Sequence, residues 1–278
     1  MKRIVRLGKC MRKMRWSALP LLALLFGCEP PADTLDFERE AVPVWRASTL
    51  TPAPHAPSSL KVMAWNIKYG AGRIDFWFDF WGDRVQLSID EVETNMDGIY
   101  RLIDEYDPDV LITSEIEVNS RRSAYFDMVQ GILDHTKLNY AAYIQTWNSR
   151  YVPQEGLGRM DLGNAIFSKY PIKQAERIRQ EDRTDQPPHV RYFYIHRAVG
   201  RAVIDVGGRE VAAYAVHTEA YDQDGTKQKH IVQIHELVKA ETLPFVLGGD
   251  FNELPPLCDE RVAGACDGVL QLSGFNDE

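Results

Sequence analysis

The sequence has little positive charge outside its first residues. Residues 1–27 hold seven basic side chains and no acidic one, and the remaining chain holds 25 basic against 40 acidic side chains, a net charge of −15. Such a surface repels polyanions unless basic groups cluster locally. The composition therefore argues against tight binding to long duplex nucleic acid, although a focused metal site could still act on a single phosphate.

Long apolar runs and zinc-protease motifs are also missing. The apolar stretch 16–26 is too short to cross a bilayer as a helix, and no His-Glu-x-x-His motif occurs. The histidines that a zinc hydrolase could use are His189, His196, His217, His230 and His235. His230 and His235 are five positions apart and would not share one face of a helix. A zinc hydrolase is therefore disfavoured.

The first 27 residues have the plan of an export signal. A cationic start precedes the apolar stretch, which ends in Leu25-Phe26-Gly27-Cys28. This pattern resembles a bacterial lipoprotein signal, and the resemblance implies that Cys28 becomes the lipidated first residue of the mature chain. Glu29 resembles the outer-membrane sorting pattern, so we expect a lipid-anchored protein of the bacterial cell envelope, at the outer membrane. The alternative is a simple secretory peptide and a secreted or periplasmic protein.

Two further features concern the exported chain. Residues 28–59 are rich in Pro, Ala, Ser and Thr and favour an extended tether ahead of a folded domain over residues 60–278. Cys258 and Cys266 form a close pair without further metal ligands nearby. In an oxidising compartment, this spacing favours a local disulfide.

The folded part mixes strand and helix patterns. Apolar strand patterns cover 61–66, 109–115, 163–168, 198–205, 209–216 and 245–248. Ser88 and Glu91 form a capping box at the start of a helix, and 227–243 also has helical spacing. Gly207-Gly208 predicts a hairpin. This mixture predicts an α/β (α+β) fold with mixed or partly antiparallel sheets.

Polar side chains follow four of these strands. They are Asn66, Glu115, His217 and the pair Asp250 and Asn252, which face the same way if the chain stays extended. Taken singly, each could be a turn former, a strand-end acid or a satisfied core histidine. Together they offer a carboxylate for a hard cation, amides that orient ligands and an imidazole for phosphoryl oxygens. The set predicts metal-assisted phosphoester hydrolysis.

The order of the motifs makes a family resemblance specific. Trp65-Asn66, Glu115, Gly163-Asn164-Ala165-Ile166, His217-Thr218 and Gly249-Asp250-Phe251-Asn252 follow one another at sensible intervals. This order resembles the endonuclease/exonuclease/phosphatase superfamily, which has the deoxyribonuclease-I-like fold. The resemblance implies a four-layer α/β/β/α sandwich of two mixed β-sheets and phosphoester cleavage that depends on Mg²⁺ or Mn²⁺.

The resemblance also assigns roles by position. Glu115 would be the principal metal ligand, with Asn66 beside it, and His217 would stabilise the phosphate. Asp250 would orient or activate the attacking water, and Asn252 would hold phosphate or metal-bound water. Asn164 matches a strand motif of the family and would have a role on the substrate side of the site.

Two departures from the family pattern affect these expectations. Thr113-Ser114 replaces the Leu-Gln that often precedes the metal-binding acid, and no Ser-Asp-His motif occurs in the 26 residues after Asn252 or elsewhere. From the second departure we expect a C-terminally truncated protein or an incomplete gene model, with severely impaired catalysis and reduced stability. The alternative function is a non-catalytic envelope lipoprotein that uses the same fold as a binding module. For an enzyme, the acidic surface and envelope location favour lipid headgroups or small phosphodiesters over nucleic acid as substrate.

Overall fold

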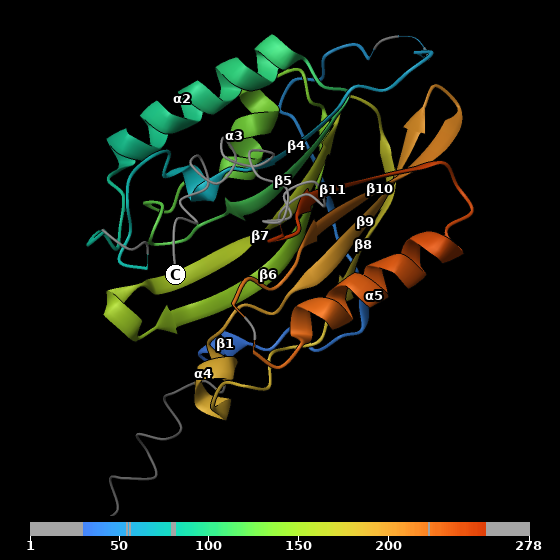
Figure 1. Cartoon of the computed structure of the whole chain (residues 1–278). Coiled ribbons are helices and arrows are strands. Elements are labelled where there is room, and N and C mark those ends of the chain that lie inside the picture. The colour runs from blue at the N-terminus through green and yellow to red at the C-terminus, as the bar shows by residue number, and fades with distance from the viewer. Residues whose placement is uncertain (1–29, 54, 56, 79–81, 222, 254–278) are drawn as a thin grey trace, which may run out of the picture. The chain divides into compact units, whose positions relative to one another are not determined.

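Two mixed β-sheets pack face to face in the computed structural model, with helices on the outer side of each sheet (Figure 1). The structure describes residues 30–53, 55, 57–78, 82–221 and 223–253. The folded unit begins at Ala32. Its layers confirm the four-layer α/β/β/α sandwich that the sequence led us to expect.

The first sheet has the strand order β1-β6-β7-β5-β4, and β3 also pairs with β6. Its strands are β1 (Ala32–Asp33), β3 (Val44–Arg46), β4 (Val62–Asn66), β5 (Val110–Glu117), β6 (Tyr140–Val152) and β7 (Gly158–Ser168). β4 and β5 run parallel, and Asn66 is in register with Ser114. The pairing of β5 with β7 shifts between Thr113 and Ile116, so Glu115 lies in a β-bulge.

The second sheet has the order β11-β10-β9-β8-β2. Its strands are β2 (Arg39–Ala41), β8 (Ile172–Arg179), β9 (Ala198–Val206), β10 (Arg209–His217) and β11 (Phe245–Asp250). β9 and β10 form the predicted hairpin, with Val206 opposite Arg209. β10 and β11 run parallel, with His217 in register with Asp250.

Helices cover the outer faces of the two sheets. α2 (Ile89–Tyr106) and α3 (Met128–His135) lie over the first sheet, and α5 (Thr226–Ala240) lies over the second (Figure 1). α2 begins after the predicted capping box: the Ser88 side chain accepts from the Glu91 amide while the Glu91 carboxylate accepts from the Ser88 amide. The shorter helical segments are η1 (Lys68–Gly70), η2 (Gln154–Gly156) and α4 (Pro188–Tyr192).

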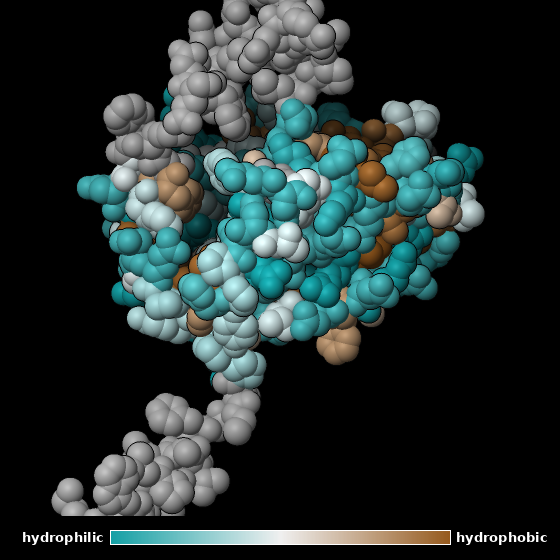
Figure 2. Space-filling view, turned by 60° about the horizontal axis from the view of Figure 1, so that its bottom comes forward, coloured by the Kyte–Doolittle hydropathy of each residue, from teal (hydrophilic) through white to brown (hydrophobic). Residues whose placement is uncertain are grey.

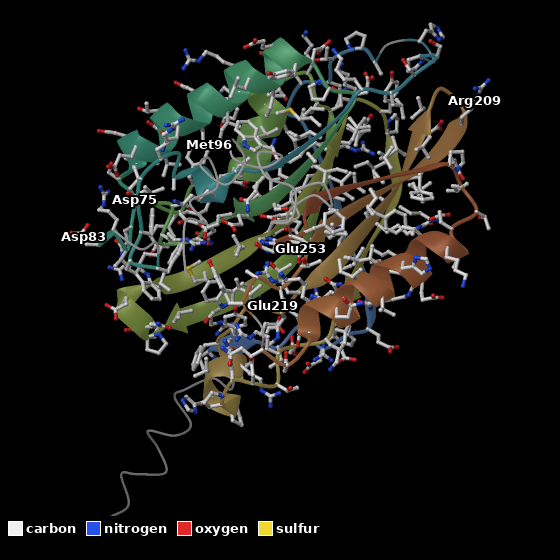
Figure 3. All side chains as sticks on the ribbon, in the orientation of Figure 1. Asp75, Asp83, Met96, Arg209, Glu219 and Glu253 are labelled. Atoms are coloured by element: carbon white, nitrogen blue, oxygen red, sulfur yellow. The ribbon has the colours of Figure 1, made fainter. Side chains whose placement is uncertain are left out.

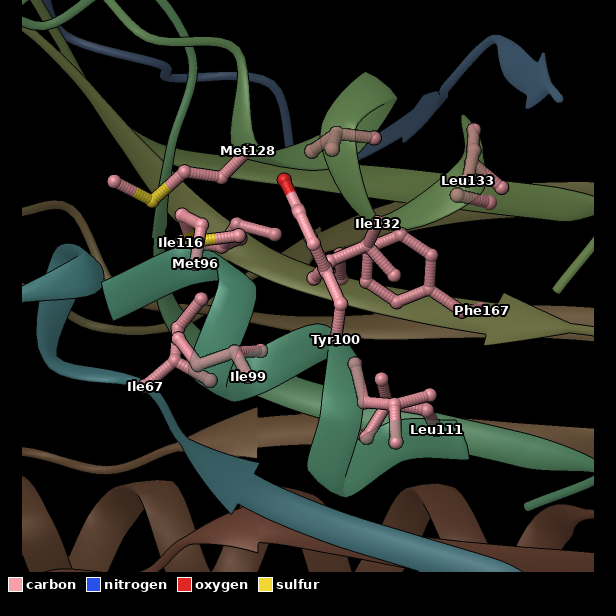
Figure 4. Close-up of a cluster of buried hydrophobic side chains, with 14 of the residues drawn as sticks. Ile67, Met96, Ile99, Tyr100, Leu111, Ile116, Met128, Ile132, Leu133 and Phe167 are labelled. Atoms are coloured by element: carbon pink, nitrogen blue, oxygen red, sulfur yellow. The ribbon is translucent and has the colours of Figure 1, made fainter. Parts of the chain in front are cut away.

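An apolar core fills the space between the first sheet and its two helices (Figure 4). It includes Ile67, Met96, Ile99, Tyr100, Leu111, Ile116, Met128, Ile132, Leu133 and Phe167. Ile67 directly follows Asn66, and Ile116 directly follows Glu115. Both isoleucines are buried. The two polar residues are thus each joined to a residue that is fixed in the core.

Small residues of the second sheet allow a close approach between the sheets. Ala202, Ala213 and Ala215 pack against larger side chains of the first sheet. A Cβ atom on Gly200 would lie 2.5 Å from Ile144 Cγ1, so Ile144 would have to shift to admit even a methyl group. Packing at this density resists the addition of even one methyl group.

Part of the expected tether over residues 28–59 belongs instead to the sheets. β1 and β3 pair with β6 of the first sheet, and β2 pairs with β8 of the second. The prediction was wrong for residues 32–46, because Pro- and Ser-rich composition does not reveal short edge strands that form only against a folded partner. Cys28, Cys258 and Cys266 lie outside the described residues. Among the helices of the described part, none is long and apolar enough to cross a membrane.

Candidate active site

Four strand ends bring Asn66, Glu115, His217 and Asp250 together. The Asn66 Nδ2 atom donates to Glu115 Oε1 at 3.1 Å and to Asp250 Oδ2 at 2.9 Å. His217 Nε2 lies 3.9 Å from Glu115 Oε1 and 4.0 Å from Asp250 Oδ2. Both sheets therefore contribute to one polar cluster, which we call the strand-end cluster.

Parallel pairing explains why these residues meet. β4 and β5 run parallel in one sheet, β10 and β11 run parallel in the other, and the carboxyl ends of parallel strands share an edge. Figure 3 shows this end through Glu219 and Glu253, which follow β10 and β11, whereas Arg209, the first residue of β10, lies at the opposite end. The fold thus assembles the cluster from residues that are far apart in sequence.

The backbone at Glu115 is unusual. Its φ angle is +55°, in the left-handed region that non-glycine residues rarely adopt, and it lies within the β5 bulge. A bulge re-aims a side chain relative to the regular strand pleat. The carboxylate of Glu115 consequently lies beside Asn66, while Ile116 enters the apolar core.

A compact turn fixes the chain after Asp250. The Asn252 amide donates to Asp250 Oδ1 at 2.8 Å, and Asn252 Nδ2 donates to the Thr218 carbonyl at 2.9 Å. The Thr218 hydroxyl donates to the Phe251 carbonyl in return. Asn252 therefore lies beside the His217–Thr218 segment, and its side chain joins the ends of β10 and β11. Its role toward phosphate or metal-bound water stays a prediction.

The surroundings of His217 favour its neutral imidazole form. Its burial lowers its pKa well below the usual value, and the nearby Arg197 guanidinium lowers it further. Arg197 is itself buried, with its Nε atom 3.6 Å from Glu219 Oε2. The Tyr194 hydroxyl also donates to Glu219, at 3.1 Å. A neutral imidazole can donate or accept one hydrogen bond beside the two carboxylates without adding charge.

Sequence reasoning missed Arg197 and Glu219. Glu219 is almost fully buried, and it lies two residues after His217, in the segment that follows β10. A buried acid between an arginine and a tyrosine hydroxyl needs tertiary partners that the sequence pattern does not indicate. The available signal was the position of Arg197 directly before the strand 198–205.

Asn164 lies apart from these contacts. It is buried in β7, in register with Ile144, and its Nδ2 atom makes no hydrogen bond to the part of the chain that the structure describes. Within that same part, no hydrogen bond joins it to the strand-end cluster. Its substrate-side role therefore stays a prediction.

Two other histidines have structural partners. His196 Nδ1 lies 3.0 Å from Asp182 Oδ1. His230 Nδ1 accepts from the Glu219 amide at 3.3 Å, and His230 Nε2 lies 2.8 Å from the Glu181 carbonyl. Through these contacts, the two histidines hold the segments around Glu181 and Asp182 and around Glu219, which connect elements of the second sheet.

The strand-end cluster suits a hard divalent cation. Mg²⁺ commonly keeps several waters and takes only one or two carboxylates from the protein. Glu115 and Asp250 supply two carboxylates, whose side chains are 26% and 29% exposed, and both attract the same Asn66 amide group. Among the described residues, no three or more His, Cys, Asp and Glu side chains converge closely enough to enclose a metal ion by themselves. The chemistry therefore fits a magnesium-like ion with few protein ligands better than a caged ion.

The strand-end cluster does not line either of two open cavities on the described surface. A cavity of about 650 Å³ is lined by residues of β8 and α5, and one of about 470 Å³ by residues of β2 and β8. Neither is lined by Asn66, Glu115, His217 or Asp250. A phosphate site needs converging polar groups rather than an enclosed apolar space, and the strand-end cluster supplies such groups. The molecular face in Figure 2 is largely hydrophilic, as the acidic composition suggests.

Comparison with known proteins places this geometry in a family. Residues 63–258 match the Endonuclease/Exonuclease/phosphatase family. No curated protein matches the chain. The matched residues include all four members of the strand-end cluster.

Several solved structures are similar to this chain at low sequence identity. An endonuclease/exonuclease/phosphatase from Beutenbergia cavernae is 18% identical with a TM-score of 0.48, and the match covers 69% of this chain and 47% of that one. A family protein from Leptotrichia buccalis is 15% identical with a TM-score of 0.46, covering 77% and 72%. Truncated TDP2 from Caenorhabditis elegans is 19% identical with a TM-score of 0.42, covering 78% and 72%.

The chain thus spans about half the length of the Beutenbergia protein. The family match covers more than half of this chain and coincides with the two-sheet sandwich and its strand-end cluster. By that match, the chain belongs to the endonuclease/exonuclease/phosphatase family.

Proposed function

We propose that this protein is a phosphoester hydrolase that depends on a divalent metal ion, Mg²⁺ or Mn²⁺. The observation that carries the proposal is the Asn66 amide between the carboxylates of Glu115 and Asp250, with the His217 imidazole about 4 Å from both. Membership of the family supports the reaction class. The metal ion, when bound, would neutralise charge on the phosphoryl oxygens.

Each residue of the strand-end cluster would have a separate role in the reaction. Glu115 would hold the metal ion, and Asn66 would orient the Glu115 and Asp250 carboxylates. Asp250 would accept a hydrogen bond from the attacking water and fix its direction. The neutral His217 imidazole would donate a hydrogen bond to a phosphoryl oxygen whose charge grows in the transition state. The depressed pKa of His217 supports this role, because the imidazole remains uncharged and available over the neutral range.

Small phosphodiesters or lipid headgroups are the substrates that we propose. The net charge of the chain after residue 27 is −15, and such a surface disfavours long polyanions. This proposal is compatible with a protein of the bacterial envelope that is anchored through Cys28. Replacing Cys28→Ala should abolish incorporation of a labelled fatty acid in a bacterial host. Processing without labelling of the unmodified chain would indicate a secreted or periplasmic protein instead.

Activity measurements test the central proposal. The chain is assayed with an activated phosphodiester and an activated phosphomonoester, in Mg²⁺ and in EDTA. We expect turnover that EDTA removes and that Asp250→Ala lowers by at least 100-fold. Asp104→Ala, on the exposed face of α2, is the matched control and should retain full activity. Turnover that persists in EDTA or in Asp250→Ala would exclude this mechanism, and specific ligand binding without turnover would favour the binding module.

A further inference from the structure

The chain makes an unusual turn directly after Asn66. Lys68, Tyr69 and Gly70 have φ angles of +44°, +42° and +68°, all in the left-handed region. Two of the three are not glycine, so this backbone must be held in place by its surroundings. The Lys68 amide donates to Asn66 Oδ1 at 2.9 Å, which couples the turn to the orientation of the Asn66 side chain.

Tyr69 is the buried centre of this turn. Its side chain is in the apolar core, and its ring makes an edge contact with Phe76 at a centroid distance of 5.0 Å. The guanidinium of Arg122 lies over the Tyr69 ring, 3.6 Å from the ring centroid. A planar cation at this distance attracts the ring face strongly when both groups are shielded from water.

The same guanidinium is bound to β5. Arg122 Nε and Nη2 donate to Glu117 Oε1 at 3.0 and 2.6 Å, and both side chains are buried. Glu117 lies two residues after Glu115, and Tyr69 lies three residues after Asn66. One arginine therefore contacts both segments that carry the first two members of the strand-end cluster. We call Tyr69, Glu117 and Arg122 the arginine clamp.

A buried ion pair can be a structural feature only, and its desolvation cost makes it weak evidence of stabilisation. Burial raises the pKa of Glu117, and the Arg122 charge opposes that shift. The position of the clamp points to more than general stability. It joins β5 just beyond the Glu115 bulge to the left-handed turn just beyond Asn66, and these two local distortions flank the 3.1 Å contact between Asn66 and Glu115.

We propose that Arg122, with Glu117 and Tyr69, is a positioning residue that keeps the Asn66 and Glu115 side chains in their observed contact at the proposed metal site. The inference rests on the proposed metal-dependent function. It adds three buried residues that would fix the positions of the metal-site side chains without contacting the metal ion. Arginine suits this task and lysine does not, because only the planar guanidinium can bind a carboxylate through two nitrogens and stack on a ring at once.

Binding of Mn²⁺ to the full chain, followed by electron paramagnetic resonance, tests this inference without an activity assay. Arg122→Met should weaken Mn²⁺ binding by at least tenfold, and Arg122→Lys should weaken it by a smaller factor because the charge remains. Arg84→Met is the matched control, since Arg84 pairs with Glu91 at 2.6 Å at the exposed start of α2. It should bind Mn²⁺ within twofold of the unmodified chain.

A second pair of variants covers the case in which Arg122→Met does not fold. Tyr69→Leu leaves the Glu117–Arg122 ion pair but removes the ring, and it should weaken Mn²⁺ binding, whereas Tyr69→Phe should restore it. Folded Tyr69→Leu and Arg122→Lys proteins with unchanged Mn²⁺ affinity would overturn the positioning role. Two other outcomes would contradict the proposed function itself. They are the absence of Mn²⁺ binding to the unmodified chain, and an Mn²⁺ affinity that Glu115→Ala leaves unchanged.

Discussion

The Asn66 Nδ2 atom lies 2.9 Å from Asp250 Oδ2, although the two residues are 184 positions apart and belong to different sheets. This contact closes the strand-end cluster across the sandwich. Because the same nitrogen also donates to Glu115, one neutral amide separates two carboxylates that would otherwise repel each other. The close approach of the two carboxylates therefore depends on the hydrogen bonds of a single neutral side chain, Asn66.

Replacement of that amide by a carboxylate should make the fold depend on metal. In Asn66→Asp, three carboxylates would meet, and we expect the free energy of unfolding without metal to fall by about 1–3 kcal/mol. Mg²⁺ should then raise the melting temperature more than it does in the unmodified protein. Thermal unfolding with and without Mg²⁺ measures both effects. Asn66→Ala, which lacks the added charge, is the control; an equal Mg²⁺ shift in both variants would contradict the prediction.

The neutral state of His217 predicts a pH dependence of stability. The folded-state pKa lies well below 6.5, so at acidic pH the unfolded chain binds a proton that the folded chain does not. The contribution of His217 to stability should be constant above about pH 6.5 and fall as the pH drops toward its folded-state pKa, with a slope of at most about 1.4 kcal/mol per pH unit. Urea unfolding between pH 5 and pH 7.5 measures the slope. His217→Gln should reduce it, and an unchanged slope would assign the effect to other groups.

Close packing between the sheets predicts a sharp cost at Gly200. A Cβ atom there would lie 2.5 Å from Ile144 Cγ1, so Gly200→Ala should lower the free energy of unfolding by about 1–3 kcal/mol. Shortening Ile144→Ala in the same chain should recover part of that loss, which a double-mutant cycle measures. Gly98→Ala in α2 is the control, because its nearest neighbour, Arg101 Nη2, is 4.0 Å from the added atom. It should stabilise the helix by about 0.5–1 kcal/mol. Additive effects of the two core changes would argue against the contact.

The segment expected to be a tether gives a deletion test. Removing residues 30–46 takes away β1, β2 and β3, which pair with both sheets, and should lower the melting temperature by several degrees. Removing residues 48–53, which carry no strand, serves as a shorter control and should cost less. Equal melting temperatures for the 30–46 deletion and the intact chain would restore the tether interpretation.

Local pattern was enough to predict the strands that carry the site. Apolar runs before Asn66, Glu115, His217 and Asp250 identified the strand ends, and their order indicated the family and the layered fold. The pairing that brings His217 opposite Asp250 depends on parallel register, which no local pattern specifies. The same holds for the Glu115 bulge, since a positive φ at a glutamate has no sequence signature.

The remaining features required tertiary partners. Arg122 and Glu117 look like ordinary surface charges in the sequence. In the structure they are buried together, and the Arg122 guanidinium packs on the Tyr69 ring, a contact that the sequence does not indicate. The edge strands β1 to β3 are two or three residues long and have no amphipathic period to detect. Such short elements form only where a sheet edge offers hydrogen-bond partners, whatever the strand preference of their residues.

These edge strands also decide how the protein would respond to mechanical tension at its N-terminus. A pull on the chain before Ala32 would load the short pairing of Ala32 and Asp33 with β6 first. It would next reach the pairing of β2 with β8 in the other sheet, and then that of β3 with β6. Each of these pairings would have to break before the load reached Asn66, so the first hydrogen bonds to yield would lie outside the strand-end cluster.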